Sequence, residues 1–213
     1  MKQVDMKSSP RSEHFEVFRT WEFPHFNISA NVDLTSFYPF VKKNNISLNL
    51  AIIYILTRTA NSIPEFRFRI RDENVIEHEV VHPSSTIMGK NGAFSFCGME
   101  YLESFPDFAD RAAEKIACVR ERPRLVEEDG GRDDWLFMTA IPWVSFTSFM
   151  HPLNFPVDCV PRFAWGKFFE ERESVKMPLS VQGHHAIMDG LHVGRYFEIV
   201  QEFLQQPEIV LTA

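Results

Sequence analysis

Two kinds of periodicity run along the first half of this chain. Residues 27–34 (NISANVDL) alternate polar and apolar side chains, which predicts a strand with one buried face. Residues 48–61 are apolar around most of a helical circumference, which predicts a buried helix. Segments 65–70 and 75–81 flank a polar stretch at 71–74, and this arrangement predicts a hairpin. The first half therefore mixes strands with helices.

The second half continues this mixture. Residues 123–134 are charged and contain two adjacent glycines, so we interpret them as a loop within one domain and not as a linker. Strands are expected at 135–141 and 177–182, and a final helix follows Gly190, where apolar residues return at helical spacing. A further helix is expected at 105–122. Its apolar face consists of Phe105, Phe108, Ala112, Ile116 and Val119.

Length and composition narrow the class of protein. A chain of 213 residues with 45% hydrophobic residues suits a single domain over 1–213 with a sizeable core. The 21 phenylalanines, 4 tyrosines and 4 tryptophans fit a Phe-rich core, and they also suit an apolar pocket or a buried subunit interface. The net charge of −7 argues against bulk affinity for nucleic acid or for an anionic membrane.

Targeting and redox signals favour a cytoplasmic protein. The first residues, MKQVD, open no apolar signal region, and the longest nearly apolar run, 48–56, is too short to cross a bilayer. The three cysteines, Cys97, Cys118 and Cys159, are odd in number and lack metal-ligand spacing. We therefore expect a reducing, cytoplasmic setting, without a membrane or nucleic-acid partner.

The most informative chemistry lies in the segment 182–190 (QGHHAIMDG), at the turn between the last predicted strand and the helix. Histidine titrates nearest neutrality, so a histidine whose tautomer is fixed is suited to act as a general base. Adjacent side chains in extended backbone point in opposite directions, so only one of His184 and His185 should be the base. Asp189 need not touch that base, because an ion pair that holds the turn is equally compatible with its position.

Residue types alone leave other interpretations of this segment open. Two satisfied histidines and an aspartate at a helix N-terminus would have a purely structural role. His184, His185, Asp189 and His192 also offer four potential metal ligands. However, adjacent histidines rarely bind one ion together and no HExxH arrangement is present, so we expect no metal. A serine nucleophile is less favoured still, because the sequence lacks a G-x-S-x-G elbow.

The segment QGHHAIMDGLHVGRYF resembles the signature of chloramphenicol acetyltransferases, His-His-x-x-x-Asp-Gly followed by a helix. Residues 140–149 (AIPWVSFTSF) resemble that family's Pro-Trp-Val-x-Phe-x-Ser-Phe segment. Residues 178–182 match its approach to the histidines, and 11–16 resemble the segment that bears its structural arginine. Dihydrolipoyl acyltransferase and condensation domains share the core motif, but their lengths and additional domains fit this chain less well.

The resemblance implies a fold and an assembly. The expected fold is α/β of the α+β type, with a mixed sheet and helices packed on it. The family is a homotrimer with its active sites at subunit interfaces, so His185 would face a pocket built largely by the neighbouring subunit.

The resemblance also implies catalytic roles. His185 would be the general base that takes the proton from an acceptor hydroxyl. Ser148 would stabilise the oxyanion that forms when this hydroxyl attacks the thioester of acetyl-CoA. Asp189 would pair with Arg11 to brace the turn, although the family's tryptophan two positions before that arginine is Ser9 here. The acetyl group passes directly to the acceptor, so acetyl-CoA is a co-substrate and no tightly bound cofactor is expected.

The acceptor expected from the resemblance is chloramphenicol or a related small amphipathic alcohol, with antibiotic resistance as the associated role. The positions that align with the family's acceptor pocket are Val17, Phe18, Phe26, Phe94, Phe96 and Ala164. The sequence departs from the family at two places: the pair 17–18 lacks a phenolic hydroxyl, and Ala164 replaces a threonine that orders water. Lys167 and Phe168 align with residues beside the adenosine end of coenzyme A. The alternatives are a different acceptor, or a non-catalytic module that binds a hydrophobic ligand.

Overall fold

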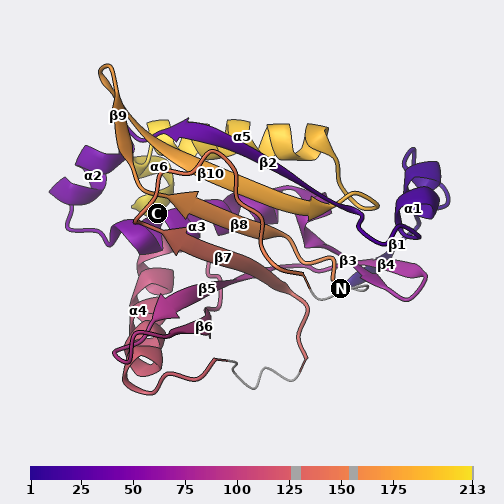
Figure 1. The fold of residues 1–213 in the computed structure, drawn as a ribbon, viewed down its shortest axis with the longest axis horizontal. Coiled ribbons are helices and arrows are strands. Elements are labelled where there is room, and N and C mark those ends of the chain that lie inside the picture. The colour runs from indigo at the N-terminus through magenta and orange to yellow at the C-terminus, as the bar shows by residue number, and fades with distance from the viewer. Residues whose placement is uncertain (126–130, 154–157, 213) are drawn as a thin grey trace.

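The computed structural model describes residues 1–125, 131–153 and 158–212, and its main feature is a seven-stranded mixed sheet (Figure 1). The strands follow the spatial order β2-β10-β8-β7-β5-β6, and β9 pairs with β10 beyond this path. The pairs β5–β7 and β7–β8 are parallel, and the other pairs are antiparallel. The strands are β2 (His25–Asp33), β5 (His82–Met88), β6 (Phe94–Gly98), β7 (Trp135–Ile141), β8 (Arg162–Gly166), β9 (Phe169–Glu171) and β10 (Ser174–His184).

The helices and a second, small sheet complete the fold. The small sheet has the order β1-β4-β3, with β1 (Lys2–Val4), β3 (Phe68–Arg71) and β4 (Asn74–Glu77). The helices are α1 (Ser12–Phe18), α2 (Phe37–Lys43), α3 (Leu48–Ser62), the 3₁₀ helix η1 (Pro64–Arg67), α4 (Phe105–Glu121), α5 (Gly190–Gln205) and α6 (Glu208–Leu211). None of the helices within the described residues is long and apolar enough to span a membrane.

The pairing of β10 gives the large sheet two different faces. Successive side chains of a strand point to opposite faces, and directly paired residues share a face. Val181 pairs with Ile28 and Phe163, so the odd positions of β10 form an apolar face. Figure 1 shows α3 and α5 on one side of the sheet and the segment 142–153 crossing the other. Ser180 Oγ donates to the carbonyl of Phe149 (2.9 Å), so this segment crosses the face of the even positions, which we call the polar face.

Most predicted elements are confirmed, with several changes at their ends. The predicted strands at 27–34 and 135–141 correspond to β2 and β7, and the predicted helices at 48–61 and 105–122 correspond to α3 and α4. All five residues predicted for the apolar face of α4 are buried. The hairpin is also present, around a turn at which Asp72 adopts a φ of 53°.

Other predicted bounds were wrong, among them the strand expected at 75–81, which spans only Asn74–Glu77. The strand expected at 65–70 begins only at Phe68, because Pro64 fixes a helical φ and opens η1. The strand expected at 177–182 runs from Ser174 to His184, because it continues to pair with β2 beyond the predicted ends. The helix after Gly190 is not the last one, since α6 follows it. Residues 126–130 of the predicted loop lie outside the described residues.

Three stacked aromatic rings join the apolar face of the sheet to the helices. The Phe163 ring of β8 lies 5.9 Å from Phe66 of η1 and 5.2 Å from Tyr196 of α5, measured between ring centroids. All three side chains are fully buried, and the Tyr196 hydroxyl donates to the Leu56 carbonyl at 3.0 Å. These contacts hold α5 against the sheet. They therefore also fix the position of the first turn of α5, which follows the histidine segment.

Phe163→Ala should therefore lower the free energy of unfolding by ~3–5 kcal/mol, because it opens a cavity between the sheet and α5. Phe163→Leu keeps most of the volume and should cost much less. Urea denaturation of both variants measures the difference. A Phe163→Ala variant as stable as the parent protein would show that this contact does not hold the helix.

Candidate active site

The histidine segment forms a tight turn between β10 and α5. The backbone N–H groups of Ile187 and Met188 both donate to the carbonyl of His184, each at 3.1 Å. The N–H of His185 donates to the carbonyl of Pro24 at 2.7 Å, which ties the turn to the start of β2. The backbone around His185 is therefore fixed on both sides of the residue.

The His185 ring has a defined tautomer. Its Nδ1 lies 3.2 Å from the carbonyl oxygen of Met188, and a carbonyl can only accept a hydrogen bond. In the neutral ring Nδ1 therefore carries the proton, and Nε2 is the nitrogen left with a free lone pair. The Phe18 ring stacks on the imidazole, with centroids 4.2 Å apart and planes 9° apart, and the Phe26 ring lies 5.0 Å away. His185 is thus oriented as a general base requires.

Arg11 stabilises the C-terminal end of the same turn. Its Nη1 forms an ion pair with Asp189, and its Nη2 donates to the carbonyls of His185 (2.9 Å) and Met188 (3.3 Å). The carbonyl of Met188 therefore contacts both Arg11 and the His185 ring. No hydrogen bond within the described residues joins Asp189 to the His185 ring. The expected Arg11–Asp189 pair is present, and its geometry is that of a brace.

Asp189 also begins α5. Its side chain accepts from the backbone N–H of Leu191 at 2.9 Å, and its own N–H donates to His192 Nδ1 at 3.1 Å, which together form a capping box. Partial burial raises the pKa of Asp189, but the charges of His192 and Arg11 and the backbone hydrogen bonds outweigh burial and lower the pKa overall. The carboxylate therefore stays ionised and holds both the helix start and the arginine.

His184 has a structural position. Its side chain is 4% exposed, its Nδ1 accepts from the N–H of Ala186 at 3.2 Å, and its ring packs edge-on against His25. Burial, together with the nearby His25, lowers the pKa of His184 to about 3, so the ring is neutral at physiological pH. Of the two adjacent histidines, His185 is the one beside the partly exposed aromatic side chains.

The four potential metal ligands of the segment have different partners. His184 contacts His25, whereas His192 Nδ1 accepts from the backbone N–H of Asp189 and its Nε2 faces the carboxylate of Glu65 at 3.4 Å. Across the part of the chain that the structure describes, no group of three His, Cys, Asp or Glu side chains is arranged to hold a metal ion. The three cysteines are all free thiols.

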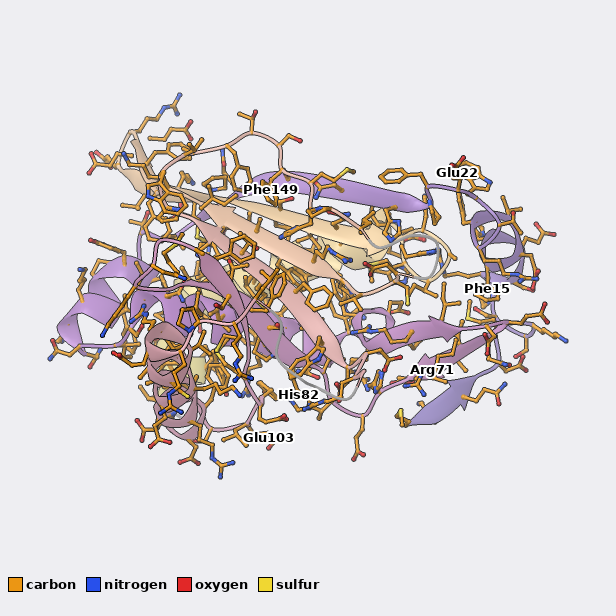
Figure 2. All side chains as sticks on the ribbon, turned by 60° about the horizontal axis from the view of Figure 1, so that its bottom comes forward. Phe15, Glu22, Arg71, His82, Glu103 and Phe149 are labelled. Atoms are coloured by element: carbon orange, nitrogen blue, oxygen red, sulfur yellow. The ribbon has the colours of Figure 1, made fainter. Side chains whose placement is uncertain are left out.

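Ser148 lies in the segment 142–153, outside any strand, and its side chain is exposed. Among the described residues, its hydroxyl has no hydrogen-bond partner, so it is available to a ligand. The segment is held on the sheet by the Ser180 hydroxyl bond to Phe149 and by the backbone N–H of His151, which donates to Gln182 Oε1 at 2.9 Å. Figure 2 shows Phe149 over the strands of the large sheet, whereas Phe15 and Glu22 mark the end of the molecule near α1.

A cavity of about 290 Å³ opens on the polar face of the sheet. The predicted acceptor residue Phe96 lines it, and Phe94 packs edge-on against Phe96 with centroids 5.6 Å apart. The sequence did not predict most of the residues that line this cavity, although the alternation of side chains along the strands places several of them on one face. The other lining residues are Ser84, Thr86, Gly98, Trp135, Phe137, Met138, Thr139, His151, Pro152 and Arg162.

The remaining predicted acceptor residues lie elsewhere in the chain. Phe18 and Phe26 contact the His185 ring, and Val17 is exposed on α1 beside Phe18. Ala164 is fully buried in β8 and pairs with Ser180. Neither His185 nor its aromatic neighbours line the described cavity. The chain thus carries two separate groups of candidate residues: His185 with its aromatic neighbours, and the cavity with the segment that contains Ser148.

The predicted coenzyme A residues follow the end of β8. Lys167 has an exposed side chain, and its backbone N–H donates to the carbonyl of Val144 at 2.9 Å. The Phe168 ring packs edge-on against Tyr38 at 6.3 Å. Lys167 is thus bonded to the start of the segment 142–153 and Phe168 contacts α2, and the role of both residues toward coenzyme A stays a prediction.

Comparison with known proteins identifies the family. The family model described as "Chloramphenicol acetyltransferase" matches residues 1–201. The chain belongs to the chloramphenicol acetyltransferase family. A chloramphenicol acetyltransferase of Escherichia coli is 35% identical over 205 residues, which cover 95% of this chain and 93% of that protein. One from Proteus mirabilis is 31% identical over 95% of this chain and 94% of its own length.

Solved structures agree with this family assignment. A chloramphenicol acetyltransferase structure superposes with a TM-score of 0.88 at 26% identity and covers 95% of this chain and 100% of its own. The dihydrolipoamide acetyltransferase of Azotobacter vinelandii has a TM-score of 0.72 at 14% identity, over 99% of this chain and 93% of its own, and so shares the fold. The predicted family and fold are confirmed, and the chain is an acyltransferase of the chloramphenicol acetyltransferase family.

The turn of this family member depends on a close contact between Gly183 and Met188. A Cβ atom added to Gly183 would overlap the sulfur of Met188, whose side chain is fully buried. Gly183→Ala should lower the free energy of unfolding by ~1–3 kcal/mol in the parent chain, because Met188 must move. In a Met188→Ala background the same change should cost much less, since the overlapping atoms are gone. A double-mutant cycle by urea denaturation measures this coupling, and equal costs in both backgrounds would contradict it.

The buried, neutral state of His184 leads to a prediction about how stability depends on pH. Its unfolded-state pKa lies near 6.5 and its folded-state pKa near 3, so the unfolded state binds more protons between these values. The contribution of this residue to stability should be fully present above pH 6.5 and fall as the pH drops toward 3. Histidine ring NMR, assigned with a His184→Gln variant, should show this ring still neutral at pH 5. A midpoint near 6.5 would contradict the buried, neutral assignment.

Proposed function

We propose that this chain is an acetyl-CoA-dependent O-acetyltransferase whose acceptor is chloramphenicol or a related small amphipathic alcohol. The observation that carries the proposal is the hydrogen bond between His185 Nδ1 and the Met188 carbonyl. In the neutral ring this bond fixes the proton on Nδ1, so that Nε2 is the nitrogen that can accept a proton from a hydroxyl. The family relatives named chloramphenicol acetyltransferase support the choice of substrates.

The proposed reaction uses His185 and Ser148 in a single direct transfer. Nε2 of His185 takes the acceptor hydroxyl proton while the oxygen attacks the thioester carbonyl carbon. The carbonyl electrons move to oxygen, and the Ser148 hydroxyl donates a hydrogen bond to this oxyanion. Collapse of the tetrahedral intermediate expels the thiolate of coenzyme A, which recovers the proton from the imidazolium. The product is an acetyl ester, and no acyl-enzyme forms.

Arg11 and Asp189 act in this scheme through the turn, as positioning residues. The guanidinium fixes the carbonyl of Met188, which in turn fixes the tautomer of His185. Asp189 keeps the guanidinium in place and begins α5. Removing either partner would leave the other charge half-buried and unpaired, which is costly. The pair therefore supports the base without contacting the substrate.

The separation of these two groups of residues, His185 with its aromatic neighbours and the cavity with the Ser148 segment, supports a homotrimer with the active site between subunits. His185, Phe18 and Phe26 of one subunit would face the cavity and Ser148 of the next. Large apolar side chains exposed on the single chain would be covered in such an assembly. They include Trp21, Phe23, Phe94, Trp143, Val144 and Met150, which are 46–69% exposed. A single domain over 1–213 and a cytoplasmic location remain predictions.

Release of the coenzyme A thiol tests the function directly. Purified protein with acetyl-CoA should release thiol only when an acceptor alcohol is present, and His185→Ala should abolish this release. Ser148→Ala should lower kcat by ~10²–10³ because one oxyanion donor is lost. Ser145→Ala is the matched control, since Ser145 is an exposed serine in the same segment, and it should retain parental activity.

Two results would contradict the proposal. Acceptor-dependent thiol release that survives His185→Ala would remove the base from its role. An acceptor that binds tightly and is never acetylated would instead favour a module that sequesters a hydrophobic ligand.

A further inference from the structure

The cavity on the polar face contains a histidine that the reaction scheme does not use. His151 lines the cavity and lies three residues after Ser148 in the same segment. Its Nε2 is buried from solvent, and among the described residues it has no hydrogen-bond partner. A buried polar nitrogen without a partner is costly, and native structures almost always supply one. The unpaired nitrogen therefore points to a ligand.

The imidazole of His151 is held in position by its neighbours. The backbone N–H donates to Gln182 Oε1 at 2.9 Å, and Gln182 is itself buried in β10. The Phe149 ring packs edge-on against the imidazole, with centroids 4.7 Å apart and planes at 85°. The ring is thus fixed before any ligand arrives, which lowers the entropic cost of binding.

The His151 imidazole is neutral at physiological pH. Burial lowers its pKa to about 4, and the positive charge of Arg162 acts in the same direction. The ring therefore offers a hydrogen bond without a charge, either as donor or as acceptor, depending on its tautomer.

The cationic group of the cavity is already paired. Arg162 Nη1 donates to Asp158 Oδ1 at 2.9 Å and to the Val160 carbonyl at 2.8 Å, and Nη2 pairs with the other oxygen of Asp158. The guanidinium carbon also lies 5.1 Å from the centre of the Phe137 ring. With this charge compensated and with Phe96, Trp135 and Phe137 in the wall, the cavity suits an uncharged aromatic ligand.

We propose that His151 determines acceptor specificity by hydrogen bonding a second polar group of an uncharged aromatic alcohol. This inference rests on the proposed acetyl transfer, in which the alcohol's hydroxyl faces His185 of the neighbouring subunit. A site built to hydrogen-bond one substrate group discriminates against analogues that lack it, because its own polar atom is then left unpaired. The family's pocket positions compared above do not include this histidine.

Acetylation of matched alcohols tests the inference. The probes are 2-phenylethanol and its 4-hydroxy, 4-amino and 4-nitro derivatives, which differ only in a polar group on the ring. The parent protein should prefer at least one polar probe over 2-phenylethanol by about tenfold in kcat/KM, which corresponds to one buried hydrogen bond. His151→Phe should abolish this preference through a higher KM for the polar probe, and His151→Gln should restore part of it. His14→Phe, an exposed histidine on α1, should keep the parental preference.

The outcomes separate this inference from the proposed function. If all four alcohols are acetylated and the preference survives His151→Phe, or if no polar probe is preferred, the role of His151 is wrong while acetyl transfer stands. If none is acetylated, calorimetric titration with the same alcohols decides: binding that prefers the polar probe and depends on His151 keeps the pocket assignment and removes the proposed function. Binding without such a preference, or no binding, overturns the role of His151.

Discussion

The antiparallel pairing of β2 with β10 is the constraint on which the rest of the structure depends. It joins residues from opposite ends of the chain in nine consecutive pairs, from Lys176–Asp33 to His184–His25. Because this register ends at His184, the turn that follows begins at a fixed point beside Pro24, to which the His185 backbone is bonded. A shift of one residue would exchange the apolar and polar faces of β10 and move His185 away from its aromatic neighbours. His185 is thus positioned first by the strand register, and only then by its own hydrogen bond.

The two faces of the large sheet contact different parts of the molecule. Its apolar face holds α5 against the core through Phe163 and Tyr196, and α5 starts at the turn. Its polar face carries the cavity and anchors the segment of Ser148 through Ser180 and Gln182. Both groups of candidate residues therefore depend on β10, although His185 and its aromatic neighbours do not line the cavity. The proposed active site between neighbouring subunits is our account of this separation.

The elements with strong local signals were predictable from the sequence, and so was the family. Helical periodicity located α3 and α4, and the spacing of His184, His185, Asp189 and Gly190 located the turn. Several other features were not predictable because they depend on long-range contacts. The chain forms the 3₁₀ helix η1 from Pro64, where a strand was expected. No pattern in the sequence indicated β1, which pairs with β4 in the small sheet. His151 and Arg162 appear in the sequence as isolated polar residues, and only the assembled sheet places them in one cavity. The family resemblance placed Phe18, Phe26 and Phe96 in one acceptor pocket. In the structure of the chain, Phe18 and Phe26 contact His185, whereas Phe96 lines the cavity on the polar face.

The central claim, that each active site combines His185 of one subunit with Ser148 of its neighbour, is tested most directly by mixing two inactive variants. His185→Ala and Ser148→Ala chains, unfolded together and refolded in equal amounts, should form mixed trimers. Each site then needs its base from one variant and its serine from the other, so about one quarter of the sites should be intact and thiol release should return to about that fraction of the parental rate. Separate refolding of each variant supplies the baseline. A mixture no more active than the separately refolded variants would place both residues in the same subunit's site and contradict the account.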